Sequence, residues 1–276
     1  MPLDTHARIF IEAADLAALI ATGTPPVLLD VRVPGEEGDG RADYRAGHIP
    51  GAVFVDLATE LADDPAGPAG RRPLPVVEIL QRDARRWGIR TGQTVVVYDD
   101  SRGQRAGRAW WVLCWGGVAD VRILSGGLAA WIAAGGAVTT DIPLPDAGDV
   151  EITPGQLPVV TADAAQAHAR AGTLLDARGA AHYAAGHIPG AISAPTSANL
   201  GTDGRFADPV TLRARFAALG VDGTRPVAVS CGGGVSAAHQ IAALASVGIS
   251  AALFPASWSG WSADPSRPIA TGAEPG

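Results

Sequence analysis

Residues 230–239 read SCGGGVSAAH and place a cysteine directly before three glycines. The small residues that follow predict a helix over about 236–247, ended by Gly248. Glycines let backbone N–H groups converge on an anion at the start of a helix, where the helix dipole is positive. Such a site favours a thiolate, the nucleophilic form of cysteine. Cys231 is therefore the predicted nucleophile, and its negative sulfur would be held by a loop made of Gly232, Gly233, Gly234, Val235 and Ser236.

Three other interpretations of a cysteine beside such a glycine loop are open. A nucleotide-binding phosphate loop needs a lysine after its glycines, and all 21 basic residues here are arginine. A cysteine phosphatase closes its loop with an arginine that grips phosphate, but the corresponding position is Ala237. A single cysteine is often just a small buried side chain, and we interpret Cys114, in WWVLCWGG, in that way. The glycine loop sets Cys231 apart.

The composition limits the class of protein. The chain has 276 residues, of which 47% are hydrophobic and 18% charged, and its net charge is −7. Scattered arginines with an acidic balance argue against nucleic acid as a partner. We see no leader pattern at the start and no apolar run long enough for a membrane span. Two cysteines without a CxxC pair indicate neither a disulfide scaffold nor a metal site. We expect a cytoplasmic protein with a free thiol and no cofactor.

The sequence contains an internal repeat that covers both halves of the chain. VLLDVR at 27–32 returns as TLLDAR at 173–178, and YRAGHIPGA at 44–52 returns as YAAGHIPGA at 183–191. VVVYDD at 95–100 corresponds to VAVSCG at 227–232, in the same order along the chain. One duplicated domain explains this order, and it places Asp99 where the second copy has Cys231.

The repeating unit predicts an α/β fold, with two tandem domains that each have a mainly parallel sheet flanked by helices on both faces. Short apolar runs that end in polar residues are typical of buried parallel strands. Residues 76–87 and 209–219 have apolar residues spaced for one buried helix face. The proline-rich segment 141–158 predicts a linker. The predicted domains are residues 1–140 and 159–276.

The quoted motifs together identify a family. GHIPGA twice, DVR and DAR, CGGGVSA and the ending SWSGWSADPSRPIATG closely resemble the tandem-domain rhodanese-like sulfurtransferases, which use 3-mercaptopyruvate or thiosulfate. The resemblance covers about residues 8–272. It implies a catalytically inert first domain and a second domain whose cysteine, here Cys231, carries sulfur as a persulfide.

The resemblance also implies roles for residues outside the loop. Arg178 matches the family arginine that binds the carboxylate or sulfonate of the donor; the alternative is an arginine that is merely paired with a neighbouring acid. Asp56 matches a family aspartate, and we expect it to support the site together with Arg72. Two positions depart from the mercaptopyruvate pattern, because Gly233 replaces a serine and Arg72 replaces a histidine. His48 and His187 occur in both copies, which favours a structural role for both.

The resemblance implies a sulfurtransferase that moves sulfane sulfur from 3-mercaptopyruvate or thiosulfate to cyanide, a small thiol or a thioredoxin-like acceptor. The loop contains no cation to hold the dianion thiosulfate, so we expect mercaptopyruvate to be preferred. One alternative is a thiosulfate-specific rhodanese. Another is a persulfide-carrying or redox module that acts with a protein partner. Neither a membrane nor nucleic acid is an expected partner.

Overall fold

The computed structural model describes residues 5–35, 38–65 and 67–276. The chain forms two compact units that exchange segments. Unit 1 contains residues 1–63, 75–156 and 203–205, and unit 2 contains residues 64–74, 157–202 and 206–276. The segment 64–74 lies within the first predicted domain but is part of unit 2. Among the described helices, none has both the length and the apolar character that a membrane span requires.

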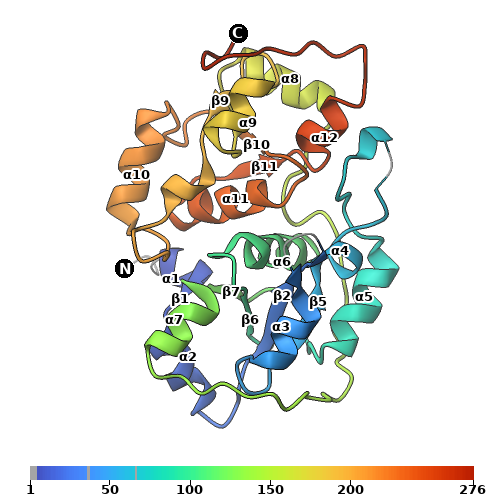
Figure 1. The fold of residues 1–276 in the computed structure, drawn as a ribbon, viewed down its shortest axis with the longest axis vertical. Coiled ribbons are helices and arrows are strands. Elements are labelled where there is room, and N and C mark those ends of the chain that lie inside the picture. Colours follow the sequence, from blue (N-terminus) through green and yellow to red (C-terminus); the bar gives the residue numbers. More distant parts are fainter. Residues whose placement is uncertain (1–4, 36–37, 66) are drawn as a thin grey trace. The chain divides into compact units, whose positions relative to one another are not determined.

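Unit 1 is built on a five-stranded parallel sheet with the order β1-β7-β6-β2-β5 (Figure 1). Parallel neighbours need crossover connections, and helices supply them here. The strands are β1 (Phe10–Ile11), β2 (Val27–Arg32), β5 (Val53–Asp56), β6 (Val95–Tyr98) and β7 (Val121–Leu124), beside the short antiparallel pair β3 (Pro34–Gly35) and β4 (Gly38–Asp39). The helices are α1 (Thr5–Ile9), α2 (Ala13–Ile20), α3 (Gly40–Ala46), α4 (Leu57–Glu60), α5 (Val77–Arg86), α6 (Gln104–Trp115) and α7 (Gly127–Ala133).

The two faces of this sheet follow from the alternation of side chains along each strand. Val96 and Tyr98 of β6 join a buried cluster with Leu16 of α2 and Trp131 of α7. Val97 points to the opposite face, where α6 packs against β6 and β7 (Figure 1). Both faces of the sheet are therefore covered, as the continuous apolar strands predict.

Unit 2 repeats this plan with a parallel sheet of order β11-β10-β8-β9. Val159 forms a parallel bridge to Leu253 at the edge where unit 1 has β1. The strands are β8 (Leu174–Asp176), β9 (Ile192–Ser193), β10 (Val227–Ser230) and β11 (Ala251–Leu253). The helices are α8 (Ala162–Arg170), α9 (Ala180–Ala185), α10 (Pro209–Ala218), α11 (Ser236–Ser246) and α12 (Ser257–Trp261), with the 3-10 turns η1 (Gly67–Ala69) and η2 (Thr196–Asn199).

Local chemistry fixes the ends of the helices in unit 2. The side chain of Asp208 accepts the backbone N–H groups of the first turn of α10, and Pro209 begins that helix. Gly220 and Gly248 follow α10 and α11 with φ values of +73° and +83°, a region that glycine enters without strain. The predicted helices over 209–219 and 236–247 are confirmed to within a residue or two. The α/β prediction is confirmed as well.

The proline-rich segment packs on unit 1 through backbone hydrogen bonds. The N–H of Gly148 donates to Arg85 O at 2.8 Å, and the N–H of Thr153 donates to Gly116 O at 2.8 Å. A side chain on Gly148 would collide with the carbonyl of Ile89, so glycine is required for this close approach. Most of the predicted linker is therefore an ordered segment that packs on unit 1.

Candidate active site

Cys231 directly follows β10, the central strand of unit 2, and α11 begins at Ser236. This is the carboxyl end of a parallel strand, where open α/β sheets bind their ligands. The thiol is buried, with 1% of the residue exposed. Gly234 has a φ of +80°, and among the loop glycines only Gly234 adopts a left-handed backbone. Its N–H donates to Cys231 Sγ at 3.1 Å. The chain thus turns back at Gly234 and points a backbone dipole at the sulfur.

Ser257, which sequence reasoning missed, holds the other side of Cys231. Its hydroxyl accepts the Cys231 N–H at 3.1 Å, donates to Phe254 O at 2.8 Å and lies 3.9 Å from Sγ. Ser257 is fully buried and has a φ of +51°, which is uncommon for a residue with a side chain. A strained backbone at a reactive group is typical of a functional site.

The two residues after Ser257 fasten the rest of the loop. The N–H of Trp258 donates to Cys231 O at 2.9 Å, and the N–H of Ser259 donates to Gly232 O at 3.0 Å. The start of α12 is therefore bound to the loop residue by residue, which leaves the loop little freedom.

Arg178, the predicted donor-binding residue, is held by its own neighbours. Its Nε and Nη2 donate to the Asp176 carboxylate at 2.9 and 2.6 Å, and Nη2 also donates to Gly186 O at 2.7 Å. The guanidinium lies 4.7 Å from the centre of the Trp258 ring. Nη1 makes none of these hydrogen bonds. The arrangement matches the alternative interpretation of Arg178, and its role toward a donor stays a prediction.

The same aspartate–arginine pair occurs in the half that lacks the cysteine. Arg32 donates from Nη2 to the carboxylate of Asp30 at 3.0 Å, both are buried, and Arg32 also pairs with Asp100. Burial raises the pKa of Asp30. The hydrogen bond and the positive charge of Arg32 lower it, but the effect of burial is larger. A pair that recurs without the cysteine has a structural role in both copies.

Asp56 and Arg72, the predicted supporting residues, belong to different units. Asp56 caps α4 in unit 1, where its carboxylate accepts the N–H of Ala58 at 2.8 Å and its own N–H donates to Glu60. Arg72 lies in segment 64–74 of unit 2, half-buried, one residue after Arg71. Their support of the site stays a prediction.

The paired histidines have matching environments. His48 and His187 are fully buried, and each stacks on the tyrosine four residues earlier. The two ring nitrogens of His187 lie 3.0 Å from Tyr183 O and 3.2 Å from Pro275 O. Contacts that tie separate chain segments together are structural, as we expected of both histidines.

Cys114, like Cys231, is a free thiol, but its surroundings differ. It lies within α6, and burial, followed by the charge of Asp120, raises the pKa of its thiol to about 12. Such a thiol stays protonated and is a poor nucleophile near neutral pH.

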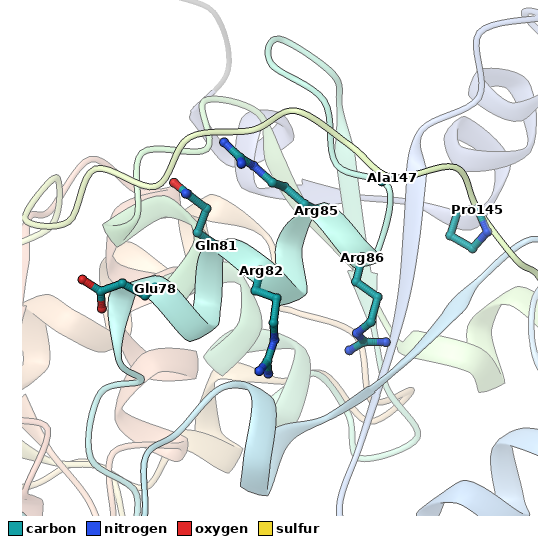
Figure 2. Close-up of a pocket in the computed structure, with 7 residues that line it drawn as sticks. All are labelled: Glu78, Gln81, Arg82, Arg85, Arg86, Pro145 and Ala147. Carbon is teal, nitrogen blue, oxygen red and sulfur yellow. The ribbon is translucent and has the colours of Figure 1, made fainter.

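The surface also has a pocket in unit 1, between one face of α5 and residues 145–147 (Figure 2). Its three arginines are occupied: Arg82 pairs with Asp83, Arg86 pairs with Glu60, and Arg85 donates to Val150 O. The residues that line this pocket include no cysteine. In the described ranges, no three His, Cys, Asp or Glu side chains are grouped to hold a metal ion.

Comparison with known proteins identifies the class of this fold and site. A profile of the rhodanese-like domain matches residues 12–134 and again residues 161–264. The thiosulfate sulfurtransferase homologue SseB of Mycobacterium tuberculosis is 45% identical over 98% of this chain and 99% of its own length. A Pseudomonas aeruginosa protein named for 3-mercaptopyruvate sulfurtransferase activity is 42% identical over 89% of this chain and 92% of its own length.

A solved structure agrees with these relatives. The crystal structure of the 3-mercaptopyruvate sulfurtransferase SseA from Escherichia coli matches 91% of this chain and 98% of its own, with a TM-score of 0.78 and 31% identity. The chain therefore belongs to the rhodanese-like family, with two domains of that fold. It is a sulfurtransferase.

Proposed function

We propose that the chain transfers sulfane sulfur from 3-mercaptopyruvate or thiosulfate to cyanide or a thiol through a persulfide on Cys231. The observation that carries this proposal is the hydrogen bond to Cys231 Sγ. The sulfur accepts it from the Gly234 N–H at 3.1 Å, just before the start of α11. Fixed dipoles directed at a sulfur that becomes negatively charged stabilise it without reorganisation.

The first half-reaction forms the Cys231 persulfide. The Cys231 thiolate attacks the sulfur of mercaptopyruvate, an S–S bond forms, and the C–S bond breaks. The electron pair of that bond stays on carbon, which takes up the thiol proton of the donor and leaves as pyruvate. With thiosulfate the S–S bond of the donor breaks, and its electron pair leaves with sulfite.

The second half-reaction returns the thiolate. Cyanide attacks the outer sulfur of the persulfide and leaves as thiocyanate, or a thiolate does so and becomes a persulfide itself. A covalent intermediate between two substrates predicts ping-pong kinetics.

Mercaptopyruvate is the donor we favour. The loop 231–236 contains no charged side chain, so it offers a dianion only backbone dipoles. The relatives carry both names, since the Mycobacterium homologue is named for thiosulfate and the Pseudomonas protein for mercaptopyruvate. A persulfide carrier for a protein acceptor is the second candidate. Gly233 and Arg72, which replace the expected serine and histidine, favour it, and a Thermus thermophilus protein 28% identical to this chain is named a sulfur carrier.

The deciding experiment measures thiocyanate formation from each donor. We expect kcat/KM to be higher with mercaptopyruvate than with thiosulfate, mainly through a lower KM. A higher kcat/KM with thiosulfate would overturn the choice of donor. Persulfide formation without turnover on cyanide or small thiols would favour the carrier.

A further inference from the structure

Unit 1 has a second cavity, at the edge of its sheet, with a volume of about 250 Å³. It lies between one face of α3, the edge strand β5 and residues 142–144 of the proline-rich segment. Helix α3 packs beside β5 (Figure 1). Sites for drug-sized ligands measure about 300–1,000 Å³, so this cavity suits a smaller molecule. None of the residues that line it is assigned to sulfur transfer.

The lining of this cavity is positively charged, although the chain as a whole has a net charge of −7. Arg41 and Arg45 lie one turn apart on α3, and Arg86 reaches the cavity from α5. Glu60 also lines the cavity, but it is paired with Arg86 at 2.6 Å. Two positive side chains spaced four residues apart on a helix repel each other. A bound anion would relieve that repulsion.

The two arginines of α3 are held differently. The guanidinium of Arg41 lies over the Phe54 ring, 4.3 Å from its centre, which fixes Arg41 against β5. Arg45 is exposed, and in the part of the chain that the structure describes its guanidinium makes neither a hydrogen bond nor an ion pair. A guanidinium donates to the two oxygens of a carboxylate at once. Arg45 is therefore available to bind the carboxylate of a ligand.

The wall formed by residues 142–144 is apolar. Ile142 is 53% exposed and Leu144 is 94% exposed, so neither side chain is covered by the rest of unit 1. Among the described residues, the backbone N–H and C=O groups of 142–147 make no hydrogen bonds. Covering these side chains would gain about 25 cal/mol for each Å² of apolar surface removed from water. This wall can therefore bind the apolar part of a ligand whose charge lies at Arg45.

We propose that this cavity binds a small organic anion, namely a carboxylate joined to an aromatic or branched apolar group. Arg45 holds the carboxylate, and Ile142 and Leu144 cover the apolar group. An inorganic anion would leave the apolar wall unused, and a neutral apolar molecule would leave the arginines unused. The half of the chain without the predicted nucleophile thus has a ligand site of its own. This inference is independent of the proposed function.

The first arm of the test compares two probes on the whole chain. Phenylacetate and phenylacetamide share an apolar group but differ in charge, and titration followed by NMR of the probe measures the Kd of each. We expect phenylacetate to bind about fivefold more tightly. Arg45→Gln should remove that advantage and leave the Kd of phenylacetamide unchanged. The control Arg213→Gln removes the same charge from the exposed face of α10 and should change neither Kd.

The second arm tests the apolar wall. Leu144→Ser should raise the Kd of both probes about threefold, because apolar contact with the phenyl ring is lost. Val210→Ser, at a valine of α10 that is 77% exposed, is the matched control and should change neither Kd. Since all four substituted side chains are exposed, the urea midpoint should stay at the wild-type value in every variant.

Two results would overturn the proposal. One is a wild-type protein that does not bind phenylacetate. The other is a Kd of phenylacetate that Arg45→Gln leaves unchanged, or that Arg213→Gln raises just as much, since the anion would then bind elsewhere or respond only to the total charge. Both arms measure binding and need no sulfur transfer. A protein without sulfurtransferase activity would overturn the proposed function and leave this test intact.

Discussion

Asp99 and Cys231 occupy the same place in the two halves of the chain. Each directly follows the central strand of its sheet, and the next helix begins at Gln104 in one half and Ser236 in the other. The Asp99 carboxylate accepts four backbone N–H groups, which belong to Ser101, Gly103, Arg105 and Ala106. The position that the predicted nucleophile occupies in unit 2 is taken in unit 1 by a side chain that accepts backbone N–H groups of its own loop and helix. In both halves the turn between strand and helix directs backbone N–H donors at the side chain that follows the strand.

This finding predicts that Asp99 stabilises unit 1. Asp99→Ala would leave buried N–H groups without partners and should lower the free energy of unfolding by about 2–4 kcal/mol. Asp99→Asn, which keeps an acceptor oxygen, should cost clearly less. Urea titration measures both. Equal losses in the two variants would show that the hydrogen bonds do not explain the effect.

The two cysteines should differ completely in function. Cys231→Ser is expected to abolish thiocyanate formation, while Cys114→Ser keeps the activity and changes at most the stability. Mass spectrometry of donor-treated protein, without reductant, should show one added sulfur, about 32 Da, on the Cys231 peptide, because the mechanism is covalent. Activity that survives in Cys231→Ser would remove the basis of the mechanism.

The raised pKa of Cys114 predicts an unusual pH dependence of the rate at which its thiol is alkylated. Its thiol ordinarily has a pKa of 9.0, and burial raises it to about 12, so the thiolate fraction at pH 8 falls roughly a thousandfold. At pH 8, alkylation of Cys114 by iodoacetamide should therefore be slower by about that factor than alkylation of a thiol with the ordinary pKa. Because a raised pKa keeps the thiol protonated longer, the rate should keep rising between pH 9 and pH 11. A plateau near pH 9 would contradict the assignment.

The backbone of Ser257 predicts an order of stability among its variants. Ser257→Ala loses the oxygen that accepts the Cys231 N–H and keeps a side chain at φ +51°. Ser257→Gly loses the same hydrogen bond but tolerates that φ, so it should be more stable than Ser257→Ala by about 1 kcal/mol. Both should form the persulfide more slowly than wild type. Equal stability of the two variants would mean that the backbone of Ser257 stores no strain.

Arg178 and Arg32 provide a matched pair of substitutions. Each replacement by alanine leaves a buried aspartate without its partner, at a cost of about 3 kcal/mol, seen as a lower urea midpoint. If Arg178 also binds the donor through Nη1, Arg178→Ala raises KM and Arg32→Ala does not. Similar KM values in the two variants would assign Arg178 a purely structural role.

The parts of the site that were predictable are those that depend on neighbours in the sequence. The strand before Cys231, the loop and the start of α11 form one continuous stretch, and glycines mark where α10 and α11 end. Duplicated motifs added the α/β plan and the family, because two copies in the same order exclude chance.

The groups that the sequence analysis missed reach the loop from far away in the chain. Ser257 lies 26 positions from Cys231, and the hydrogen bond from Arg71 to Ser259 spans 188 positions. Neither residue has a local pattern that marks it, since an exposed arginine and a serine in a turn are both common. The ending SWSGW carried the family resemblance, but only the fold shows that its backbone fastens the loop.

The exchange of segments between the units has a consequence for how the protein is made. Unit 1 contains residues 203–205, whose Arg205 pairs with Glu12, so it is completed only after residues 157–202 of unit 2 have left the ribosome. Segment 64–74, made early, must wait for its partners at 256–260. Domains usually fold in the order of their synthesis. Here unit 1 waits for residues 203–205 and unit 2 for residues near the end of the chain, and a cut in the linker would leave segment 64–74 on a different polypeptide from Cys231.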